Sequence, residues 1–327
     1  MAKPRILVIG TGGTIASVGA DSLDVLDYPD YGTRLEMAAV LARVPEVERF
    51  ATVRAVDYRA VPSSAIGPAD WLALARLVAA QAGDADGFVI THGTSTLEET
   101  AYFLDLVLTI PQPVVLVGAQ RPISAVGSDA PMNLVAAVRT AAAPAASGLG
   151  VLVVLNDEIH AAREVSKTST YRVQTFRTPD FGALGQVDGD GVQIYRHPVH
   201  RQAGGFDVAA LAALPRVDIA YSYAGADGAA IDAFVAASAA GIVSAGFAPG
   251  LTAPDELAAL RRARASGVVV VQSSRVGSGR IAPRRFLRAE GFIGADNLTP
   301  QKARILLALA LTRTRELAPI EAMFATR

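Results

Sequence analysis

Gly10–Ser17, which reads GTGGTIAS, and Thr91–Phe103, which reads THGTSTLEETAYF, decide the fold class of this chain. We call these stretches the first and second threonine loops. In each of them an apolar run changes within a few residues into a polar segment that contains glycine and threonine. In a parallel α/β sheet, ligands bind at the carboxyl ends of the strands, where loop amides and helix N-termini converge. Two threonines at such an edge indicate hydroxyl-based chemistry.

Apolar runs of strand length alternate with helical segments through the first half of the chain. The runs are continuous in Val, Ile and Leu, as in parallel strands that are buried on both faces. They are Arg5–Ile9, Thr52–Val56, Gly87–Thr91, Val114–Val117 and Val151–Leu155. Apolar residues recur at helical spacing in Asp70–Ala82, Thr96–Thr109 and Met132–Thr140. The alternation predicts an α/β fold with a large, doubly wound, mainly parallel sheet.

A polar, glycine-containing segment at residues 195–213 predicts a linker between two domains. We assign residues 1–194 to an N-terminal catalytic domain and residues 214–327 to a smaller C-terminal α/β domain. In the second domain Thr299 and Pro300 suit the N-cap and first turn of the last helix. Its other expected elements are the strands Asp218–Ser222, Ile242–Ser244 and Val268–Gln272 and the helices Ala230–Ala239 and Asp255–Ala265.

The composition favours a small-molecule partner. The 327 residues are 51% hydrophobic, and 30 basic against 31 acidic residues give a formal net charge of −1. This balance provides no electrostatic footprint for nucleic acid or an anionic membrane. The lack of cysteine excludes disulfides and thiolate catalysis, and the four histidines lack metal-ligand spacing. No apolar run reaches the roughly 18 residues of a membrane span, and Ile6–Ile9 is too short for a signal sequence, so we expect a cytoplasmic protein.

The first threonine loop has three possible interpretations. Gly10–Gly12 opens like a dinucleotide-binding fingerprint, but Ile15 occupies the third glycine position and no strand with an acidic end follows at the proper distance. A second interpretation is a tight turn with an N-capping threonine. The third is a glycine hairpin whose amides and Thr14 hydroxyl face a substrate carbonyl, as nucleophilic catalysis requires.

The second threonine loop and a lysine further along the chain have both structural and catalytic interpretations. Thr94 and Ser95 could cap the following helix, whose first turn contains Glu98 and Glu99, and His92 alone is more typical of a packed core histidine than of a general base. Lys167, in the stretch REVSKTST, is typical of a solvated charge. A desolvated lysine can nevertheless activate a hydroxyl for attack on a carbonyl, so a Thr–Lys pair is chemically sufficient.

Taken together, several long motifs in order resemble the bacterial-type L-asparaginase family, also called asparaginase/glutaminase. The resemblance covers nearly the whole chain. It runs through TGGTIAS at Thr11–Ser17, DGFVITHGT at Asp86–Thr94, LEETAYFLDL at Leu97–Leu106, VGAQRP at Val117–Pro122, LNDEIHAAREVSKT at Leu155–Thr168, GIVSAG at Gly241–Gly246, SSRVGSG at Ser273–Gly279 and TPQKARILLALALT at Thr299–Thr312.

The resemblance implies a two-domain α/β enzyme without cofactor or metal, a homodimer or homotetramer in which the C-terminal domain completes the site. It implies hydrolysis of L-asparagine to L-aspartate and ammonia through an acyl-enzyme. Thr14 would be the nucleophile, and Thr94 and Lys167 the proton-transfer pair. A lid tyrosine would assist, and spacing does not choose between Tyr28 and Tyr31; we take Tyr28 as the candidate. The residues expected to bind the substrate are Ser63, Ser64, Gly93 and Ser95.

The chain departs from the family pattern at three positions, all of which concern the α-ammonium group of asparagine. Ser95 replaces an expected aspartate, Leu251 replaces an asparagine, and Pro283–Arg285 lies where an acid is expected, with none before Glu290. One interpretation is an asparaginase that holds the ammonium group through backbone carbonyls, Ser95 or water. The other is an amidohydrolase for a related amide that lacks a free α-ammonium group.

Two further functions are compatible with such a fold. An asparaginase-like subunit of a tRNA-dependent amidotransferase would carry an additional N-terminal domain, whereas Arg5–Ile9 begins the core at once. An amino-acid sensor would not need to keep Thr14, Thr94 and Lys167. Both are weaker predictions than an amidohydrolase.

Overall fold

The computed structural model describes residues 2–198 and 205–327. These residues form two compact units: the first contains residues 2–198 and 205–210, and the second begins at Leu211. Within the first unit the backbone N–H of Phe206 donates to the carbonyl of Leu106 at 2.9 Å. The predicted linker, 195–213, includes residues 199–204, which lie outside the described residues.

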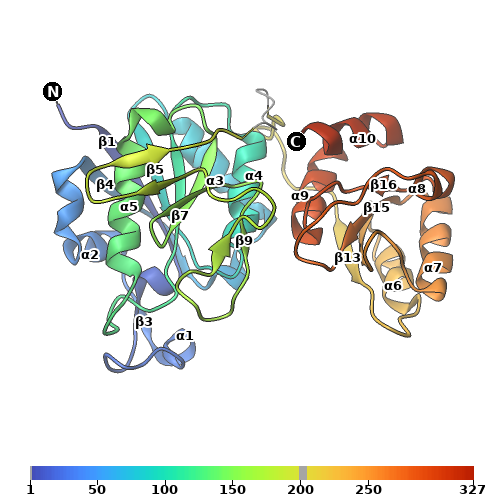
Figure 1. The fold of residues 1–327 in the computed structure, drawn as a ribbon, viewed down its shortest axis with the longest axis horizontal. Coiled ribbons are helices and arrows are strands. Elements are labelled where there is room, and N and C mark those ends of the chain that lie inside the picture. The colour runs from blue at the N-terminus through green and yellow to red at the C-terminus, as the bar shows by residue number, and fades with distance from the viewer. Residues whose placement is uncertain (1, 199–204) are drawn as a thin grey trace. The chain divides into compact units, whose positions relative to one another are not determined.

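The first unit is built on an eight-stranded mixed sheet (Figure 1). Its strand order is β12-β11-β8-β7-β6-β5-β1-β4. The strands from β7 to β4 are parallel, as the sequence predicted, whereas β8, β11 and β12 extend the sheet in antiparallel fashion. The bounds are β1 Arg5–Gly12, β4 Thr52–Val61, β5 Gly87–Thr91, β6 Val114–Val117, β7 Val151–Leu155, β8 Glu158–Ala161, β11 Gly185–Val187 and β12 Val192–Ile194.

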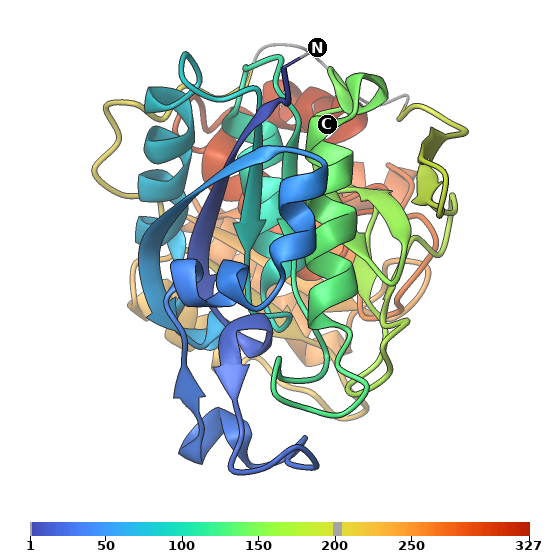
Figure 2. The ribbon, with the colours of Figure 1, turned by 90° about the vertical axis from the view of Figure 1, so that its left-hand side faces the viewer.

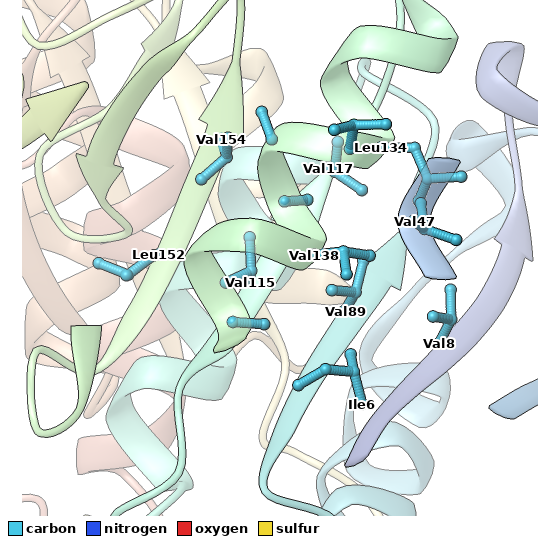
Figure 3. Close-up of a cluster of buried hydrophobic side chains, with 14 of the residues drawn as sticks. Ile6, Val8, Val47, Val89, Val115, Val117, Leu134, Val138, Leu152 and Val154 are labelled. Atoms are coloured by element: carbon cyan, nitrogen blue, oxygen red, sulfur yellow. The ribbon is translucent and has the colours of Figure 1, made fainter. Parts of the chain in front are cut away.

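Helices cover both faces of this sheet, and the core is continuous across it. The helices are α2 Met37–Ala42, α3 Pro68–Ala80, α4 Leu97–Val107 and α5 Ala130–Ala142. Alternate side chains of a strand point to opposite faces, so Ile6 and Val8 of β1 share one face, where they belong to the same cluster as Leu134 and Val138 of α5 (Figure 3). Leu7 and Ile9 are equally buried on the other face. The doubly wound prediction is confirmed.

A small hairpin extends from the carboxyl edge of the parallel strands (Figure 2). Its strands, β2 (Ser17–Val18) and β3 (Thr33–Arg34), pair antiparallel, with Ser17 opposite Arg34. The short helix α1, Tyr28–Tyr31, lies between them. Both candidate tyrosines therefore lie in the hairpin that follows β1.

The second unit has a four-stranded parallel sheet in the order β13-β14-β15-β16, and the smaller α/β domain is confirmed. Its strands are β13 Val217–Tyr221, β14 Gly241–Gly246, β15 Val269–Ser274 and β16 Ile293–Gly294. Its helices are α6 Ala229–Ala236, α7 Pro254–Ala265, α8 Arg285–Glu290, α9 Pro300–Ala310 and α10 Leu317–Thr326. Helix α9 begins at Pro300 as predicted, although the Thr299 hydroxyl makes no capping bond, and α10 was not predicted. No helix in the described ranges has both the length and the apolar composition needed to cross a membrane.

Candidate active site

The two threonine loops lie against one another because β1 and β5 are neighbouring parallel strands, with Gly10 in register with Thr91. Each loop has a glycine at its close contact, Gly13 in the first and Gly93 in the second. A Cβ atom on Gly13 would lie 2.4 Å from the backbone N and Cα of Gly93, and Gly13 has a φ of 81°. A Cβ atom on Gly93 would in turn lie 2.7 Å from Ser63 Oγ. The close approach brings three loops, and their hydroxyls, to one point of the sheet edge.

The hydroxyl of Thr14 is hydrogen-bonded to the hydroxyl of Tyr28 at 2.9 Å. Thr14 is the first residue of a short 3-10 turn and not its cap, so the N-cap interpretation was wrong. Burial raises the pKa of Tyr28, so its phenol is protonated near neutral pH and can either donate or accept. Tyr31 is 85% exposed. Of the two candidate tyrosines, the structure therefore joins Tyr28 to Thr14.

Lys167 is fixed between Thr94 and Glu98. Its Nζ donates to Thr94 Oγ1 at 2.8 Å, and its backbone N–H donates to Glu98 Oε2 at 3.0 Å. Burial lowers the pKa of Lys167, whereas the carboxylate of Glu98 raises it. Sequence reasoning assigned Glu98 only to the first turn of the helix; the structure adds that its buried carboxylate positions the lysine. Lys167 is therefore not a freely solvated charge.

The predicted substrate-binding residues lie beside these pairs. Ser63 is buried, and its Oγ accepts from the backbone N–H of Ser95 at 3.2 Å. Its carbonyl accepts from the hydroxyl of Thr96 at 2.8 Å. Thr96, and neither Thr94 nor Ser95, occupies the N-cap position of α4. The side chains of Ser64 and Ser95 are exposed at the same opening.

A pocket of about 240 Å³ unites all the predicted site residues. This volume lies below the roughly 300–1,000 Å³ that is usual for drug-sized ligands, so it suits a small substrate. Other lining residues were not predicted as site residues, and Arg34, Gln120, Thr170 and Tyr171 are among them. Gln120 follows the carboxyl end of β6, so its place at the same edge was predictable. Among the described lining residues Arg34 and Lys167 are the charged side chains, and none is an acid.

His92 is a packed core histidine that supports the second threonine loop. It is fully buried, and burial lowers its pKa to about 4. The carbonyl of Gly93 can only accept, so Nδ1 of the neutral ring carries the proton and donates to it at 2.7 Å. Nε2 therefore accepts from the Thr100 hydroxyl at 2.9 Å, and Thr100 Oγ1 in turn accepts from the indole N–H of Trp71, also at 2.9 Å. This chain fixes Gly93, the neighbour of Thr94.

The other departures from the family pattern lie in the second unit. Leu251 is 43% exposed and forms an isolated bridge with Phe247. The Arg284 guanidinium lies 5.6 Å from the centre of the Phe286 ring, and Glu290 pairs with Arg261 at 2.6 Å. Within the ranges that the structure describes, no three acidic or histidine side chains are grouped so that they could hold a metal.

Comparison with known proteins finds family models and relatives that match nearly the whole length of this chain. The family model described as "Asparaginase, N-terminal" matches residues 5–200, and "Glutaminase/Asparaginase C-terminal domain" matches residues 216–324. "Probable L-asparaginase periplasmic" of Haemophilus influenzae is 41% identical, covering 98% of this chain and 92% of its own. "Glutaminase-asparaginase" of Pseudomonas fluorescens biotype A is 37% identical, covering 98% and 90%. A crystal structure titled "Probable Cytoplasmic L-asparaginase from Campylobacter jejuni" superposes with a TM-score of 0.96 at 38% identity, covering 99% of this chain and 100% of that one.

Proposed function

Because the chain belongs to the asparaginase family and is an asparaginase-type amidohydrolase, we propose that Thr14 is the nucleophile of a covalent acyl-enzyme. The observation that carries this proposal is the meeting of two hydrogen-bonded pairs in one small pocket. Thr14 is paired with Tyr28 at 2.9 Å, and Thr94 with Lys167 at 2.8 Å. A nucleophile and a proton-transfer group are thus available on the wall of the same site.

The proposed reaction proceeds in two steps. The Thr14 hydroxyl, oriented by Tyr28, attacks the carbonyl carbon of the amide. Lys167 in its neutral form acts through the Thr94 hydroxyl, taking the proton that Thr14 loses and returning it to the leaving nitrogen. Water then hydrolyses the threonine ester with the same pair as its base. The burial of Lys167 supports this role, since it lowers the pKa and increases the neutral fraction.

The proposed substrate is L-asparagine, which would yield L-aspartate and ammonia. The hydroxyls of Ser63 and Ser64 would bind the substrate carboxylate, and the backbone of Gly93 and Ser95 forms the adjoining wall of the pocket. The printed names of the relatives, which include both L-asparaginases and glutaminase-asparaginases, support a small carboxamide.

A second candidate substrate is a carboxamide without a free α-ammonium group. The specific observation in its favour is that no acid occurs among the described residues that line the pocket, where Ser95 replaces the expected aspartate. A lost charge-assisted hydrogen bond costs about 1.5–3 kcal/mol, or ten- to a hundredfold in affinity. We would therefore expect an amine-free amide to bind at least as well as asparagine.

Ammonia release by wild type, Thr14→Ala and Thr14→Ser tests both the nucleophile and the choice of substrate. The substrates would be L-asparagine, L-glutamine, succinamate and N-acetyl-L-asparagine. We expect Thr14→Ala to abolish release and Thr14→Ser, which keeps a hydroxyl, to retain part of it. Undiminished turnover by Thr14→Ala would refute the nucleophile. Faster turnover of succinamate than of L-asparagine would select the second candidate.

We also propose that the protein forms a homodimer or homotetramer and that it is cytoplasmic. One solved relative is titled cytoplasmic and a curated relative is named periplasmic, so the names of relatives do not agree on the compartment. Light scattering across a dilution series, with activity measured in parallel, tests the assembly. Full specific activity in a monomer would contradict it.

A further inference from the structure

Lys167 lies on a two-stranded ribbon, which we call the lysine ribbon and define as residues 166–178. Strand β9 (Ser166–Lys167, Figure 1) pairs antiparallel with β10 (Phe176–Arg177), and Lys167 lies opposite Phe176 in this register. The strand that carries the lysine is therefore hydrogen-bonded along its edge to a second strand. Whatever fixes β10 also fixes the backbone of the lysine.

Threonine side chains join the two halves of the lysine ribbon beyond Lys167. The backbone N–H and the hydroxyl of Thr168 both donate to the carbonyl of Thr175, at 2.8 and 2.9 Å. The Thr175 hydroxyl donates to the carbonyl of Ser169 at 2.5 Å, and Thr175 is fully buried. These bonds tie the outgoing and returning halves of the ribbon together. A contact made by one half is therefore transmitted to the other.

The returning half is held by a buried histidine that the proposed reaction does not use. His160, on β8, is 1% exposed, and its Nδ1 is hydrogen-bonded to the hydroxyl of Thr178 at 3.1 Å. Thr178 directly follows β10 and is also buried, so this bond is shielded from water. At the other end of the ring, Nε2 lies 3.4 Å from the carboxylate of Glu158. The imidazole thus links the main sheet to the lysine ribbon.

The register of the main sheet directs His160 toward the ribbon. In β8 it lies opposite Val153 of β7, whereas its neighbours Ile159 and Ala161 belong to the core cluster on the α5 face. Alternate side chains of a strand point to opposite faces, so His160 points away from α5. The sheet therefore fixes the direction of the histidine, and the histidine fixes the end of β10.

Packing alone does not explain a histidine at this position. A buried imidazole costs free energy unless its nitrogens have polar partners, whereas an apolar side chain of similar size would carry no such cost. The partners of His160 come from two directions, Glu158 on its own strand and Thr178 on the ribbon. Its two nitrogens therefore serve to connect two elements, which indicates a role in positioning.

We propose that His160 is a positioning residue for Lys167, acting through Thr178 and the pairing of β10 with β9. The inference rests on the proposed function, in which Lys167 and Thr94 transfer the proton. With the link intact, Lys167 Nζ stays 2.8 Å from Thr94 Oγ1 and half-buried. Burial lowers the pKa of Lys167, so a ribbon that moves outward would hydrate the amine and raise its pKa.

Thr178→Val tests the link because it keeps the shape of the side chain and removes its hydroxyl. The readout is the pH profile of kcat and kcat/KM for ammonia release from L-asparagine and succinamate. We expect kcat to fall by about tenfold, which is part of the 10²–10⁴-fold that a positioned proton-transfer group contributes. The Lys167-dependent limb should move to higher pH by about half a unit or more, because the amine loses burial.

Two further variants complete the test of the link. Thr178→Ser keeps the hydroxyl and should restore the wild-type profile. His160→Leu should reproduce the effect of Thr178→Val, and the double variant should be no worse than either single one, since both break the same bond. Circular dichroism checks that each variant is folded, and if His160→Leu does not fold, the two variants of Thr178 decide the outcome.

Thr140→Val is the matched control. The Thr140 hydroxyl is also buried and donates to the carbonyl of Ala136 within α5, on the other face of the sheet. Its loss should lower the unfolding midpoint and leave the pH profile unchanged. A shifted limb in Thr178→Val therefore cannot be attributed to reduced stability.

The outcomes separate this inference from the proposed function. An unmoved limb in Thr178→Val, with or without a loss of kcat, would overturn the positioning role and leave the proposed function standing. Equal effects of Thr178→Ser and Thr178→Val would overturn it as well. Undiminished turnover by Lys167→Met would overturn the proposed role of the lysine, and the inference with it.

Discussion

Removing one hydroxyl behind the second threonine loop should destabilise the first unit. In Thr100→Val the side chain keeps its shape and loses the hydroxyl that links Trp71 Nε1 to His92 Nε2 at 2.9 Å on each side. Thr100 and His92 are both fully buried, so water cannot replace the lost partner. The substitution leaves two buried polar groups unsatisfied at once.

Each unsatisfied buried group costs about 1–3 kcal/mol, so with two such groups the free energy of unfolding should fall by about 2–6 kcal/mol in Thr100→Val. Thr100→Ser keeps the hydroxyl and loses a methyl group, for which we expect about 1 kcal/mol. The same chain of bonds fixes the carbonyl of Gly93 at 2.7 Å, so kcat should fall in Thr100→Val and be largely kept in Thr100→Ser.

Urea unfolding monitored by tryptophan fluorescence measures this effect. Trp71 is the chain's one tryptophan, so the signal reports the first unit. Comparison of midpoints at an unchanged slope gives the loss of stability. The reasoning would be refuted by a Thr100→Val protein within about 0.5 kcal/mol of wild type, or by an equal loss in Thr100→Ser, since either would show that the hydroxyl contributes nothing as a bridge.

Three further predictions concern ionisation and the tyrosine. Burial lowers the pKa of His92 from the ordinary value of 6.5 to about 4 in the folded chain, so the unfolded chain binds the extra proton first, and the free energy of unfolding falls by about 3 kcal/mol as the pH drops from 6.5 to 4. NMR should find the His92 imidazole neutral at pH 5.5, and a protonated ring would contradict this. Glu98→Gln should move the Lys167-dependent limb of the kcat/KM pH profile to lower pH, because the carboxylate raises the pKa of Lys167. A limb that stays in place or moves to higher pH would contradict the assignment of this limb to Lys167. Tyr28→Phe should lower kcat/KM by about 10²–10⁴-fold while Tyr31→Phe keeps near wild-type activity, and equal losses would show that the bond to Thr14 is not the cause.

The parallel core of the fold was predictable because strands that are buried on both faces have unbroken apolar sequences. The predicted bounds of β5, β6 and β7 agree with the structure residue for residue. The antiparallel extension was missed because β11 and β12 are only three residues each. The sequence did contain one signal for this hairpin, the pair Asn156-Asp157. In the structure both residues have positive φ, at 52° and 61°, as a two-residue hairpin between β7 and β8 requires.

The candidate site was predictable to the extent that strand register determines it. Because β1 and β5 are neighbouring parallel strands, the loops that carry Thr14 and Thr94 begin at the same edge of the sheet, and both residues line one pocket. The choice between Tyr28 and Tyr31 depends on how α1 is rotated, which local spacing does not encode. The contact of Glu98 with Lys167 joins residues 69 positions apart, and no sequence periodicity connects them.

The structure also explains how residue 95 can change while the reaction machinery is kept. At this position the scaffold uses the backbone N–H, which donates to Ser63 Oγ, and the side chain is exposed at the pocket opening. The backbone bond forms whether the side chain is a serine or the expected aspartate. The groups that we propose to act on the amide are held by other contacts, namely the close approach of Gly13 to Gly93 next to Thr14 and the bond from the Lys167 backbone N–H to the Glu98 carboxylate. Under the proposed function, recognition of the substrate amine is therefore separable from the chemistry at the carbonyl, and we expect the identity of residue 95 to affect which amide is bound more than how it is cleaved.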